Sequence, residues 1–266
     1  MNLNPVAIVI PIYKTSLKDY ELMSLQQCYK ILNNFPIVFV KPESLSLSSY
    51  KSLVDSNNWH IESFDNDYFK DIQGYNRLLL SESFYARFLK YEYILIYQLD
   101  AFIFKDELQY WCKQGYDYIG APWVQRYKFK RKIRSLIHYK LNRKQRNGVL
   151  PTSLQFYNRV GNGGFSLRKV EKFYELCKTQ KLLIDYYNQN EHNFYNEDVF
   201  WSLEVNRKKK QLYIPHYRKA LHFSIEQDPA LAMRLNEGNL PFGAHALYAF
   251  SEFWRPYVKE AGYDFF

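Results

Sequence analysis

The sequence predicts an α/β fold in which a mostly parallel central sheet is covered by helices on both faces. The first observation is composition: the 266 residues are 47% hydrophobic and 24% charged, with only 10 Gly and 10 Pro, which excludes disordered and collagen-like chains. The second is that strand-like apolar runs alternate with segments of helical spacing. The third is that these runs are continuously apolar, as in strands buried on both faces.

The first elements follow this alternation in order. Residues 6–12 form a continuous apolar run that predicts a buried strand. Residues 18–33 carry apolar side chains at helical spacing and predict the first helix. Residues 36–40 and 59–64 predict the second and third strands, and a further helix is expected from about residue 75 to residue 91.

The fourth strand is predicted over residues 93–104, where only Gln98 and Asp100 are not apolar. An unpaired carboxylate in a buried strand is costly, so Asp100 needs a partner or a ligand. In open parallel sheets ligands bind beyond the carboxyl ends of the strands, and Asp100 lies at that end. There it can hold a divalent metal or a sugar hydroxyl, or it can cap the helix that follows.

The features that bear on cellular location favour the cytosol. Cys28, Cys112 and Cys177 lie far apart and have no zinc-site or disulfide spacing, which is typical of reduced thiols. The first residues lack the basic region and cleavage site of a signal peptide. No run of eighteen apolar residues predicts a spanning helix. We expect a cytoplasmic protein, with peripheral association at the inner face of the cell membrane as a further hypothesis.

Positive charge is concentrated in one segment. The formal net charge is +9, yet no acidic residue lies between Asp117 and Glu171, a stretch that holds 13 Lys and Arg residues. The rest of the chain is slightly acidic, so the net charge does not mark the whole protein as a nucleic-acid binder. Within this stretch, residues 130–146 predict a cationic helix.

This cationic helix carries an apolar stripe. Ile133, Leu136, Ile137 and Leu141 follow one another at helical spacing among Lys and Arg residues. The pattern is typical of a helix that lies on an anionic membrane surface. The same four residues can also pack the helix on the domain, and the pattern leaves both interpretations open.

Three further clusters are candidate site segments. Residues 160–168, VGNGGFSLR, concentrate glycines before an apparent strand and helix, which lets backbone approach a ligand closely, although they match neither a dinucleotide fingerprint nor a P-loop. Glu197 and Asp198 begin a predicted helix, where carboxylates can cap the helix or act as a general base. His222 and His245 each lie in an apolar context, which suits a core histidine as well as a metal ligand.

Taken in order, these segments resemble a glycosyltransferase family. They are similar to an uncharacterised bacterial family with the GT-A fold, catalogued as a domain of unknown function. The segments that carry this resemblance are the strand VAIVIPIYK, the helix YNRLLLS, the strand YEYILIYQLDAFIF and the blocks GYDYIGAPW, VGNGGFSLR, NEDVFW and PFGAHAL. The resemblance extends from Val6 to about Leu247. It implies one domain over residues 1–266, with a basic insertion at about 125–150 and a C-terminal segment at about 220–266 that closes the site.

For the site, the resemblance implies a nucleotide-sugar donor at the carboxyl edge of the sheet. GT-A enzymes bind a divalent ion, Mn²⁺ or Mg²⁺, with a DxD motif, and the matching residues here are Gln98, Leu99 and Asp100. Asp100 matches the metal-binding acid, and His245 or His222 would complete the metal site. The donor-binding residues implied are Pro11, Tyr13, Lys14, Arg77, Ser81, Gln98, Asp100, Gly163, Gly164 and Arg168.

The resemblance also implies the chemistry and the partners. In an inverting transfer Asp198 is the expected base for the acceptor hydroxyl, with Glu197 as the second candidate; in a retaining transfer this pair would position the acceptor. A divalent ion at Asp100 would stabilise the departing diphosphate, and Arg77, Arg87 or Arg168 would add a positive clamp. The expected partners are a nucleotide sugar, first of all a UDP-sugar, a glycan or lipid-linked acceptor of bacterial surface polysaccharide synthesis such as capsule or lipopolysaccharide, and an anionic membrane surface along residues 126–146; no nucleic acid is expected.

Two other functions fit parts of the pattern. A nucleotidyltransferase can be built on a similar sheet, although the segment IPIYKTSLKDYE after the first strand lacks the glycines that such enzymes carry there. The 25 tyrosines and the basic stretch would also suit a non-enzymatic module that binds polysaccharide or nucleic acid. Against such a module, the aromatic and basic residues do not interleave in a single-strand-binding pattern.

Overall fold

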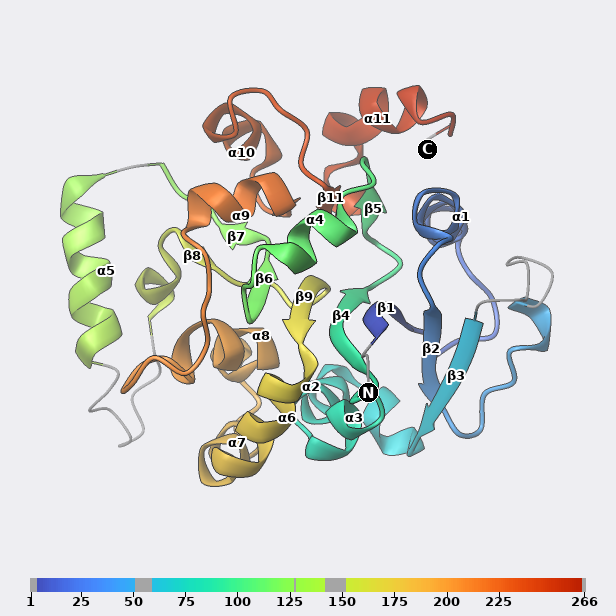
Figure 1. The fold of residues 1–266 in the computed structure, drawn as a ribbon. Coiled ribbons are helices and arrows are strands. Elements are labelled where there is room, and N and C mark those ends of the chain that lie inside the picture. Colours follow the sequence, from blue (N-terminus) through green and yellow to red (C-terminus); the bar gives the residue numbers. More distant parts are fainter. Residues whose placement is uncertain (1–3, 51–58, 127, 142–151, 265–266) are drawn as a thin grey trace.

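The computed structural model describes residues 4–50, 59–126, 128–141 and 152–264, and its centre is a six-stranded sheet (Figure 1). The strands are β1 (Asn4–Pro11), β2 (Ile37–Pro42), β3 (Trp59–Phe64), β4 (Tyr91–Tyr97), β6 (Tyr118–Gly120) and β9 (Phe165–Lys169). They lie in the order β3-β2-β1-β4-β9-β6. The pairs among β3, β2, β1 and β4 are parallel, whereas β9 runs antiparallel to β4 and β6. The predicted mostly parallel sheet is confirmed.

The apolar runs of the sequence form the buried middle of this sheet. Val9 of β1 lies in register with Val38 of β2 and Ile96 of β4, and none of the three is more than 2% exposed. Both faces of these strands are covered because helices lie on both sides of them (Figure 1). Each such side chain contributes about 1.5–3 kcal/mol on burial, so the sheet is the centre of the hydrophobic core.

Eleven α-helices and several short strands complete the described part of the chain. The helices are α1 (Asp19–Leu32), α2 (Ile72–Leu79), α3 (Glu82–Ala86), α4 (Leu108–Lys113), α5 (Phe129–Leu141), α6 (Val170–Thr179), α7 (Lys181–Asn188), α8 (Glu197–Val199), α9 (Tyr217–Phe223), α10 (Pro229–Leu235) and α11 (Ser251–Glu260). The short strands are β5 (Phe102–Ile103), β7 (Pro122–Trp123), β8 (Arg159–Val160), β10 (Ser224–Ile225) and β11 (Gly243–Ala244). The helix predicted over residues 18–33 is confirmed as α1.

The prediction of one helix over residues 75–91 is wrong, because the chain turns in the middle of it. α2 begins earlier than predicted, where Asp71 caps it. After α2 the Ser81 hydroxyl donates to the Leu78 carbonyl at 2.7 Å and accepts from the Phe84 amide at 3.1 Å. Ser81 is therefore the N-cap of a second helix, α3.

The strand predicted over residues 93–104 is likewise divided in two. β4 ends at Tyr97, and the Ala101 amide then donates to the Gln98 carbonyl at 2.9 Å, which closes a turn. The Tyr97 hydroxyl donates to the Ala101 carbonyl at 3.2 Å and holds this turn against the strand. β5 then joins a different sheet, next to β11. Asp100 thus lies on a turn just beyond the carboxyl end of β4.

The C-terminal part of the chain forms a second apolar cluster beside the sheet. β10, β11 and β5 form a three-stranded sheet in that order, and α10 and α11 lie above it in Figure 1. Phe102 of β5 packs in this cluster with Trp254 of α11. The Leu247 amide donates to the Asp100 carbonyl at 2.9 Å. These contacts hold His245, which directly follows β11, beside the turn after β4.

The basic helix α5 lies at the edge of the molecule, apart from the central sheet (Figure 1). Residues 142–146 of the predicted helix lie outside the described residues. Ser135 of α5 is buried, and Tyr139 packs against a small cluster that contains Trp123 and Leu203. The helix is therefore attached to the domain by the side that carries Ser135 and Tyr139.

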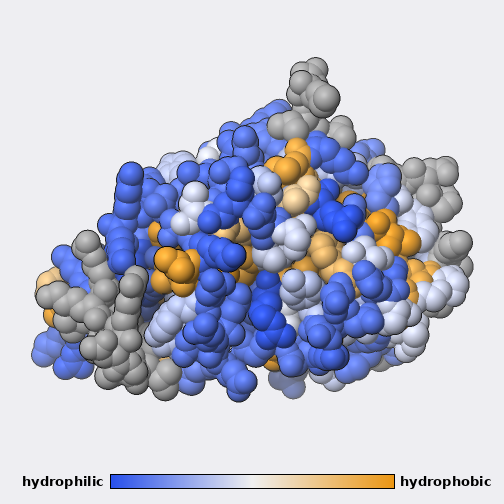
Figure 2. All heavy atoms as spheres, turned by 90° about the horizontal axis from the view of Figure 1, so that it is seen from below, coloured by the Kyte–Doolittle hydropathy of each residue, from blue (hydrophilic) through white to orange (hydrophobic). Residues whose placement is uncertain are grey.

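The apolar stripe of α5 is not the side that packs on the domain. Ile133, Leu136 and Ile137 are 42%, 45% and 49% exposed, so the interpretation in which they pack the helix on the domain is wrong for these three residues. Figure 2 shows hydrophobic atoms beside strongly hydrophilic ones at the left end of the molecule, the end where α5 lies in Figure 1. Within the described ranges, none of the helices combines the length and the apolar character that crossing a bilayer requires.

Candidate active site

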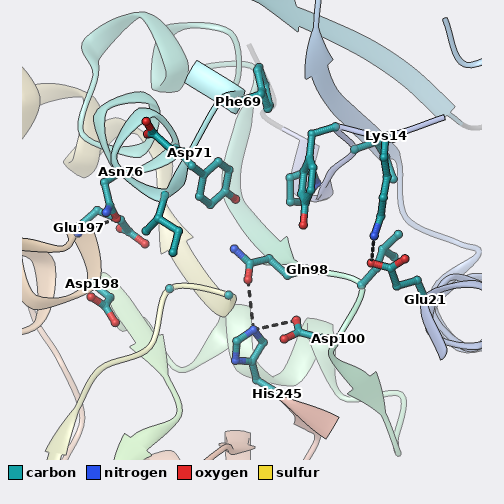
Figure 3. Close-up of a pocket in the computed structure, with 18 of the residues that line it drawn as sticks. Lys14, Glu21, Phe69, Asp71, Asn76, Gln98, Asp100, Glu197, Asp198 and His245 are labelled. Carbon is teal, nitrogen blue, oxygen red and sulfur yellow. Dashed lines mark hydrogen bonds and ion pairs between the residues drawn. The ribbon is translucent and has the colours of Figure 1, made fainter. Parts of the chain in front are cut away.

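A pocket of about 610 Å³ opens at the carboxyl ends of β1 and β4 (Figure 3). Because β9 runs antiparallel to β4, the glycine block that precedes β9 lies at the same edge of the sheet. The backbone amide of Gln98 donates to the Gly164 carbonyl at 2.8 Å and joins the end of β4 to the glycine block. Of the residues expected at the site, Pro11, Tyr13, Lys14, Gln98, Asp100, Gly163, Gly164, Glu197, Asp198 and His245 line the pocket.

Asp100 and His245 form an ion pair in this pocket (Figure 3). His245 Nε2 lies 3.0 Å from Asp100 Oδ1 and 3.2 Å from Gln98 Oε1, while Nδ1 lies 3.3 Å from Glu226 Oε1. Burial alone would lower the pKa of His245, but Asp100 and Glu226 raise it to about 10, so the ring is protonated at neutral pH. Burial opposes ionisation of Asp100, yet the charge and hydrogen bond of His245 outweigh it and lower the pKa of Asp100.

Asn162 fixes Glu226 behind His245 and shapes the glycine block. Its Nδ2 donates to Glu226 Oε1 at 2.5 Å, and its Oδ1 accepts from the Gly164 and Phe165 amides at 3.0 and 3.3 Å. Asn162 has a φ of 53°, in the left-handed region that Asn adopts more readily than most residues. The turn at Asn162 thereby connects the glycine block to the support of the imidazole.

The donor atoms of this corner suit a divalent metal that is also bound by a substrate. Among the described residues there is no group of three or more His, Cys, Asp or Glu side chains that could hold a metal ion alone. The Asp100 carboxylate, the Gln98 amide oxygen and His245 Nε2 nevertheless converge, and oxygen and imidazole ligands suit Mn²⁺. His245 would bind the ion as a neutral ring, so the metal would have to displace the proton that Asp100 and Glu226 hold on the imidazole of the metal-free protein. Glu226 Oε1 lies beside Nδ1, the ring nitrogen of His245 that faces away from Asp100. A carboxylate in this position commonly orients an imidazole that binds a metal through its other nitrogen. The residues fit the ion where a diphosphate supplies further oxygen ligands.

Arg168 and Glu197 form a buried ion pair next to the pocket. Arg168 Nη2 lies 3.0 Å from Glu197 Oε1; the arginine is fully buried and the glutamate is 4% exposed. Arg168 also donates to the Tyr85 hydroxyl at 2.9 Å and to the Ser166 hydroxyl at 3.0 Å. Burial raises the pKa of Glu197 even though Arg168 acts in the opposite direction. Arg168 uses its hydrogen-bond donors inside the core, so it is not available as the expected clamp on the donor.

Asp198 is half-buried at the start of α8 and lines the pocket (Figure 3). Its Oδ1 accepts from the Val199 amide at 2.8 Å. Burial, followed by the charges of Glu197 and Glu226, raises the pKa of Asp198 to about 7. A carboxylate with a pKa near neutrality is suited to accept a proton from a bound hydroxyl.

Gly163 and Gly164 are required by the side chains that pack against them. A Cβ atom at Gly163 would overlap the Glu197 carboxylate, and one at Gly164 would overlap the His245 ring and the Gln98 amide. The Gly164 backbone amide donates to Asn162 Oδ1 at 3.0 Å, so this amide is not free to bind the donor. These glycines allow Glu197 and His245 to approach the same edge of the sheet.

The end of β1 supplies an exposed aromatic ring and a cation. Tyr13 is 58% exposed and lines the pocket. Lys14 Nζ lies 2.5 Å from Glu21 Oε1; burial acts to lower the pKa of Lys14, but the Glu21 hydrogen bond and charge raise it. Figure 3 shows Lys14 and Glu21 on the side of the pocket opposite Glu197 and Asp198.

Arg77, Ser81, Arg168 and His222 do not line the pocket, although the sequence resemblance places them there. Ser81 caps α3, and Arg168 is buried beside Glu197. Arg77 follows the pocket-lining Asn76 on α2, and neighbouring residues on a helix point about 100° apart. His222 is exposed at the end of α9, so of the two histidines only His245 lies beside Asp100.

The structure adds Asn76 and Glu226, which the sequence pattern does not single out. Asn76 Oδ1 accepts from the Glu197 amide at 3.1 Å, and its Nδ2 donates to Asn196 Oδ1 at 3.1 Å, which fixes the start of α8. Asn76 lies in the segment YNRLLLS, and Glu226 lies four residues after His222 in the segment LHFSIE. A carboxylate in an apolar segment indicates a site at Asp100, and the same signal applies to Glu226.

Solved structures of glycosyltransferases share this fold. The apo structure of WbbM, a bifunctional glycosyltransferase, has a TM-score of 0.51 and 14% identity over 91% of this chain, which spans 45% of the WbbM chain. Mouse xyloside xylosyltransferase 1 in its apo form has a TM-score of 0.51 and 11% identity over 91% of this chain and 98% of its own. The galactosyltransferase LgtC, in complex with donor and acceptor sugar analogues, has a TM-score of 0.52 and 14% identity over 90% of this chain and 86% of the LgtC chain. The expected GT-A fold is confirmed.

A family model matches most of the chain. The comparison with curated proteins gave no match. The model described as "Protein of unknown function (DUF5672)" matches residues 58–245, from the start of β3 to the histidine of the pocket. This range includes the turn after β4, the glycine block and α8, which together carry most of the candidate site. The chain belongs to the DUF5672 family.

Proposed function

We propose that this protein is a glycosyltransferase that moves a sugar from a nucleotide-sugar donor to a hydroxyl of a glycan acceptor. One observation carries the proposal: a single pocket at the carboxyl edge of the parallel strands combines the Asp100–His245 pair with Asp198, a carboxylate whose pKa is raised to about 7. Glycosyl transfer needs both elements, a site for the donor diphosphate and a group that handles the acceptor proton.

The donor is proposed to bind between the end of β1 and the turn after β4. Tyr13 offers an exposed ring for a nucleobase, and Lys14 offers a cation near the phosphates. Asp100 and His245, with the Gln98 amide oxygen beside them, would hold a Mn²⁺ or Mg²⁺ ion. Such an ion, when bound, neutralises the charge that develops on the departing diphosphate.

The acceptor is proposed to bind beside α8. In an inverting transfer the acceptor oxygen bonds to the anomeric carbon, and the bond from that carbon to the diphosphate breaks on the opposite face, so the diphosphate leaves with the electron pair. Asp198 takes the proton of the acceptor hydroxyl during this attack. Glu197 lies against Arg168 and is proposed to support the position of Asp198 rather than to take the proton itself.

The substrate classes are part of the proposal. We propose a UDP-sugar as donor and a glycan or lipid-linked glycan of bacterial surface polysaccharide synthesis as acceptor. Two things support this choice: the resemblance of the sequence segments to a bacterial glycosyltransferase family, and the structural likeness to LgtC, a galactosyltransferase solved with donor and acceptor sugar analogues.

The product released from nucleotide substrates tests the proposal against the nucleotidyltransferase alternative. The protein is incubated with Mn²⁺ and a panel of nucleotide sugars, and separately with nucleoside triphosphates plus sugar 1-phosphates. A glycosyltransferase releases a nucleoside diphosphate from one nucleotide sugar, by transfer or by slow hydrolysis. Release of pyrophosphate from a triphosphate and a sugar 1-phosphate, without diphosphate release from any nucleotide sugar, would overturn the proposal.

The pH dependence of the reaction follows from Asp198. We expect kcat/KM to rise with pH and to level off above an apparent pKa of about 7, because only ionised Asp198 accepts the proton. Initial rates measured from about pH 5 to about pH 9 check this expectation. The exposed carboxylate Asp185 on α7 provides a control, since Asp185→Asn should leave the profile unchanged. A rate that does not change between these limits would contradict the assignment of the base.

A further inference from the structure

We propose that α5 docks the protein on an anionic lipid surface, with the outward face of the helix as the contact. This proposal goes beyond the transfer reaction, and vesicle binding tests it separately from nucleotide binding. The observation that carries it is that one face of α5 combines exposed apolar side chains with lysines and arginines, opposite the side by which the helix is attached.

The attached and free sides of α5 are opposite because of the helical repeat. Ser135, on the attached side, is 3% exposed. Successive residues turn by about 100°, so Ile133 and Ile137 lie about 160° from Ser135 around the helix. The outward apolar residues are Phe129, Ile133, Leu136 and Ile137, which are 65%, 42%, 45% and 49% exposed. Four large apolar side chains on one helix face are more than the single exposed residues that are common on protein surfaces.

The helix is held firmly enough to present this face. The Tyr139 hydroxyl donates to the Leu203 carbonyl at 3.3 Å, and Arg207 Nη1 donates to the Tyr139 carbonyl at 2.9 Å. The Arg159 and Arg207 guanidinium groups lie over the Tyr139 ring, at 4.6 and 4.8 Å from its centre. These contacts orient α5, so the outward face is a property of the folded domain.

Positive charge surrounds the apolar face. Lys130, Arg131, Lys132, Arg134 and Lys140 of α5 are exposed, and none of them forms an ion pair within the part of the chain that the structure describes. Arg207 joins α5 to the loop that carries three exposed lysines, Lys208, Lys209 and Lys210. These residues form a cationic surface that needs an anionic partner.

An anionic bilayer fits this combination better than the other partners do. Lipid headgroups accept the cations while the boundary of the acyl chains accepts the apolar side chains. A nucleic acid would use the charges but would leave the four apolar residues in water. A second copy of the chain would bring the same positive charge to the contact and would repel the first.

Vesicle flotation tests the proposal with the full chain. The protein should float with vesicles of phosphatidylcholine plus phosphatidylglycerol at low salt, but not with phosphatidylcholine alone, and high salt should release it. Lys130→Glu/Arg134→Glu/Lys140→Glu should weaken this binding about 100-fold, given the contribution of each cation near an anionic surface. Ile133→Ser/Leu136→Ser/Ile137→Ser should also weaken it, whereas each variant should keep the nucleotide response of the wild type.

Matched variants elsewhere on the surface serve as controls. Lys90→Glu/Lys113→Glu/Lys181→Glu changes the same number of exposed charges away from α5. Ile61→Ser/Leu89→Ser/Leu182→Ser changes three apolar residues that are 45%, 39% and 89% exposed. The apolar control should leave binding as in the wild type, and the charge control should weaken it far less than the α5 variant. If an α5 variant does not fold, Phe129→Trp is measured in its place. The fluorescence of the added tryptophan should be quenched when the protein binds vesicles that contain brominated lipids.

Several results would overturn the proposal. The first is absence of flotation with phosphatidylglycerol vesicles at low salt. The second is equal loss of binding in the α5 variants and their controls, which would point to net charge alone. The third is RNA or DNA binding that depends on α5 in a protein that does not float, and the fourth is concentration-dependent association of the chain that Ile133→Ser/Leu136→Ser/Ile137→Ser abolishes.

Discussion

Asp198→Asn is expected to lower kcat by about 10³-fold, within the range that general-base catalysis usually contributes. Asn keeps the size of the side chain and an oxygen that can accept from the Val199 amide, but it cannot take a proton. The affinity for a nucleoside diphosphate should not change, since within the described residues Asp198 forms no hydrogen bond or ion pair with Asp100 or His245. Steady-state kinetics and calorimetric titration of the nucleotide measure the two quantities.

The same substitution should increase stability at neutral to alkaline pH. The folded-state pKa of Asp198 is raised from 3.8 to about 7, so the folded protein binds this proton more tightly than the unfolded chain does. The free energy of unfolding therefore falls as pH rises across that window, and Asn, which carries no charge, removes this loss. Thermal unfolding at about pH 8 should give a higher Tm for the variant than for the wild type, because above pH 7 the loss is complete.

Asp185→Asn on α7 is the control for removal of a carboxylate, and it should change neither activity nor stability. A variant Asp198→Asn that keeps kcat and only raises KM for the acceptor would contradict the role as base. It would instead assign Asp198 to positioning of the acceptor, which is the role that a retaining transfer requires.

Arg168→Met is expected to lower the free energy of unfolding by about 3–5 kcal/mol, the usual cost of removing one partner of a buried ion pair. The substitution leaves the Glu197 carboxylate in the core without its cation, and it removes the donors to the Tyr85 and Ser166 hydroxyls. Equilibrium unfolding in urea measures this loss. The start of α8 should also be displaced, so transfer activity should fall together with stability.

An exposed ion pair gives the matched control. Arg87 is 55% exposed and lies 3.6 Å from Glu62, so Arg87→Met should cost less than about 1 kcal/mol. The double variant Arg168→Met/Glu197→Leu should lose less stability than the sum of the two single variants, because no charge remains buried without a partner. Equal costs for Arg168→Met and Arg87→Met would show that Arg168 does not hold the core of the site.

The sheet and much of the pocket could be predicted from the sequence because their signals are local. A continuous apolar run implies a strand buried on both faces, and a polar residue at its carboxyl end marks the ligand edge of a parallel sheet. This signal predicts the position of Asp100. The glycines before β9 and the acidic pair at the start of α8 also interrupt apolar segments in a manner that the sequence displays.

The remaining features depend on contacts between distant segments. The apolar run from residue 93 to residue 104 gives no sign that β5 leaves the sheet of β4, since both strands are equally apolar. His222 and His245 have similar local surroundings, and only the pairing of β11 with β5 brings one of them to Asp100. Arg168 follows the glycine block as a donor-binding residue would, but Glu197 and Tyr85 hold it in the core.

A nucleotide thermal-shift measurement on wild type and Asp100→Ala tests the central claim most directly. Nucleoside diphosphates and nucleotide sugars are added with and without Mn²⁺, and a ligand at about 100 times its Kd should stabilise the folded protein by about 2.7 kcal/mol. We predict that one nucleotide raises the Tm of the wild type by several degrees and that Asp100→Ala loses this shift while keeping its own fold. Absence of a shift with every nucleotide, with or without Mn²⁺, would contradict the assignment of the pocket as a nucleotide-sugar site.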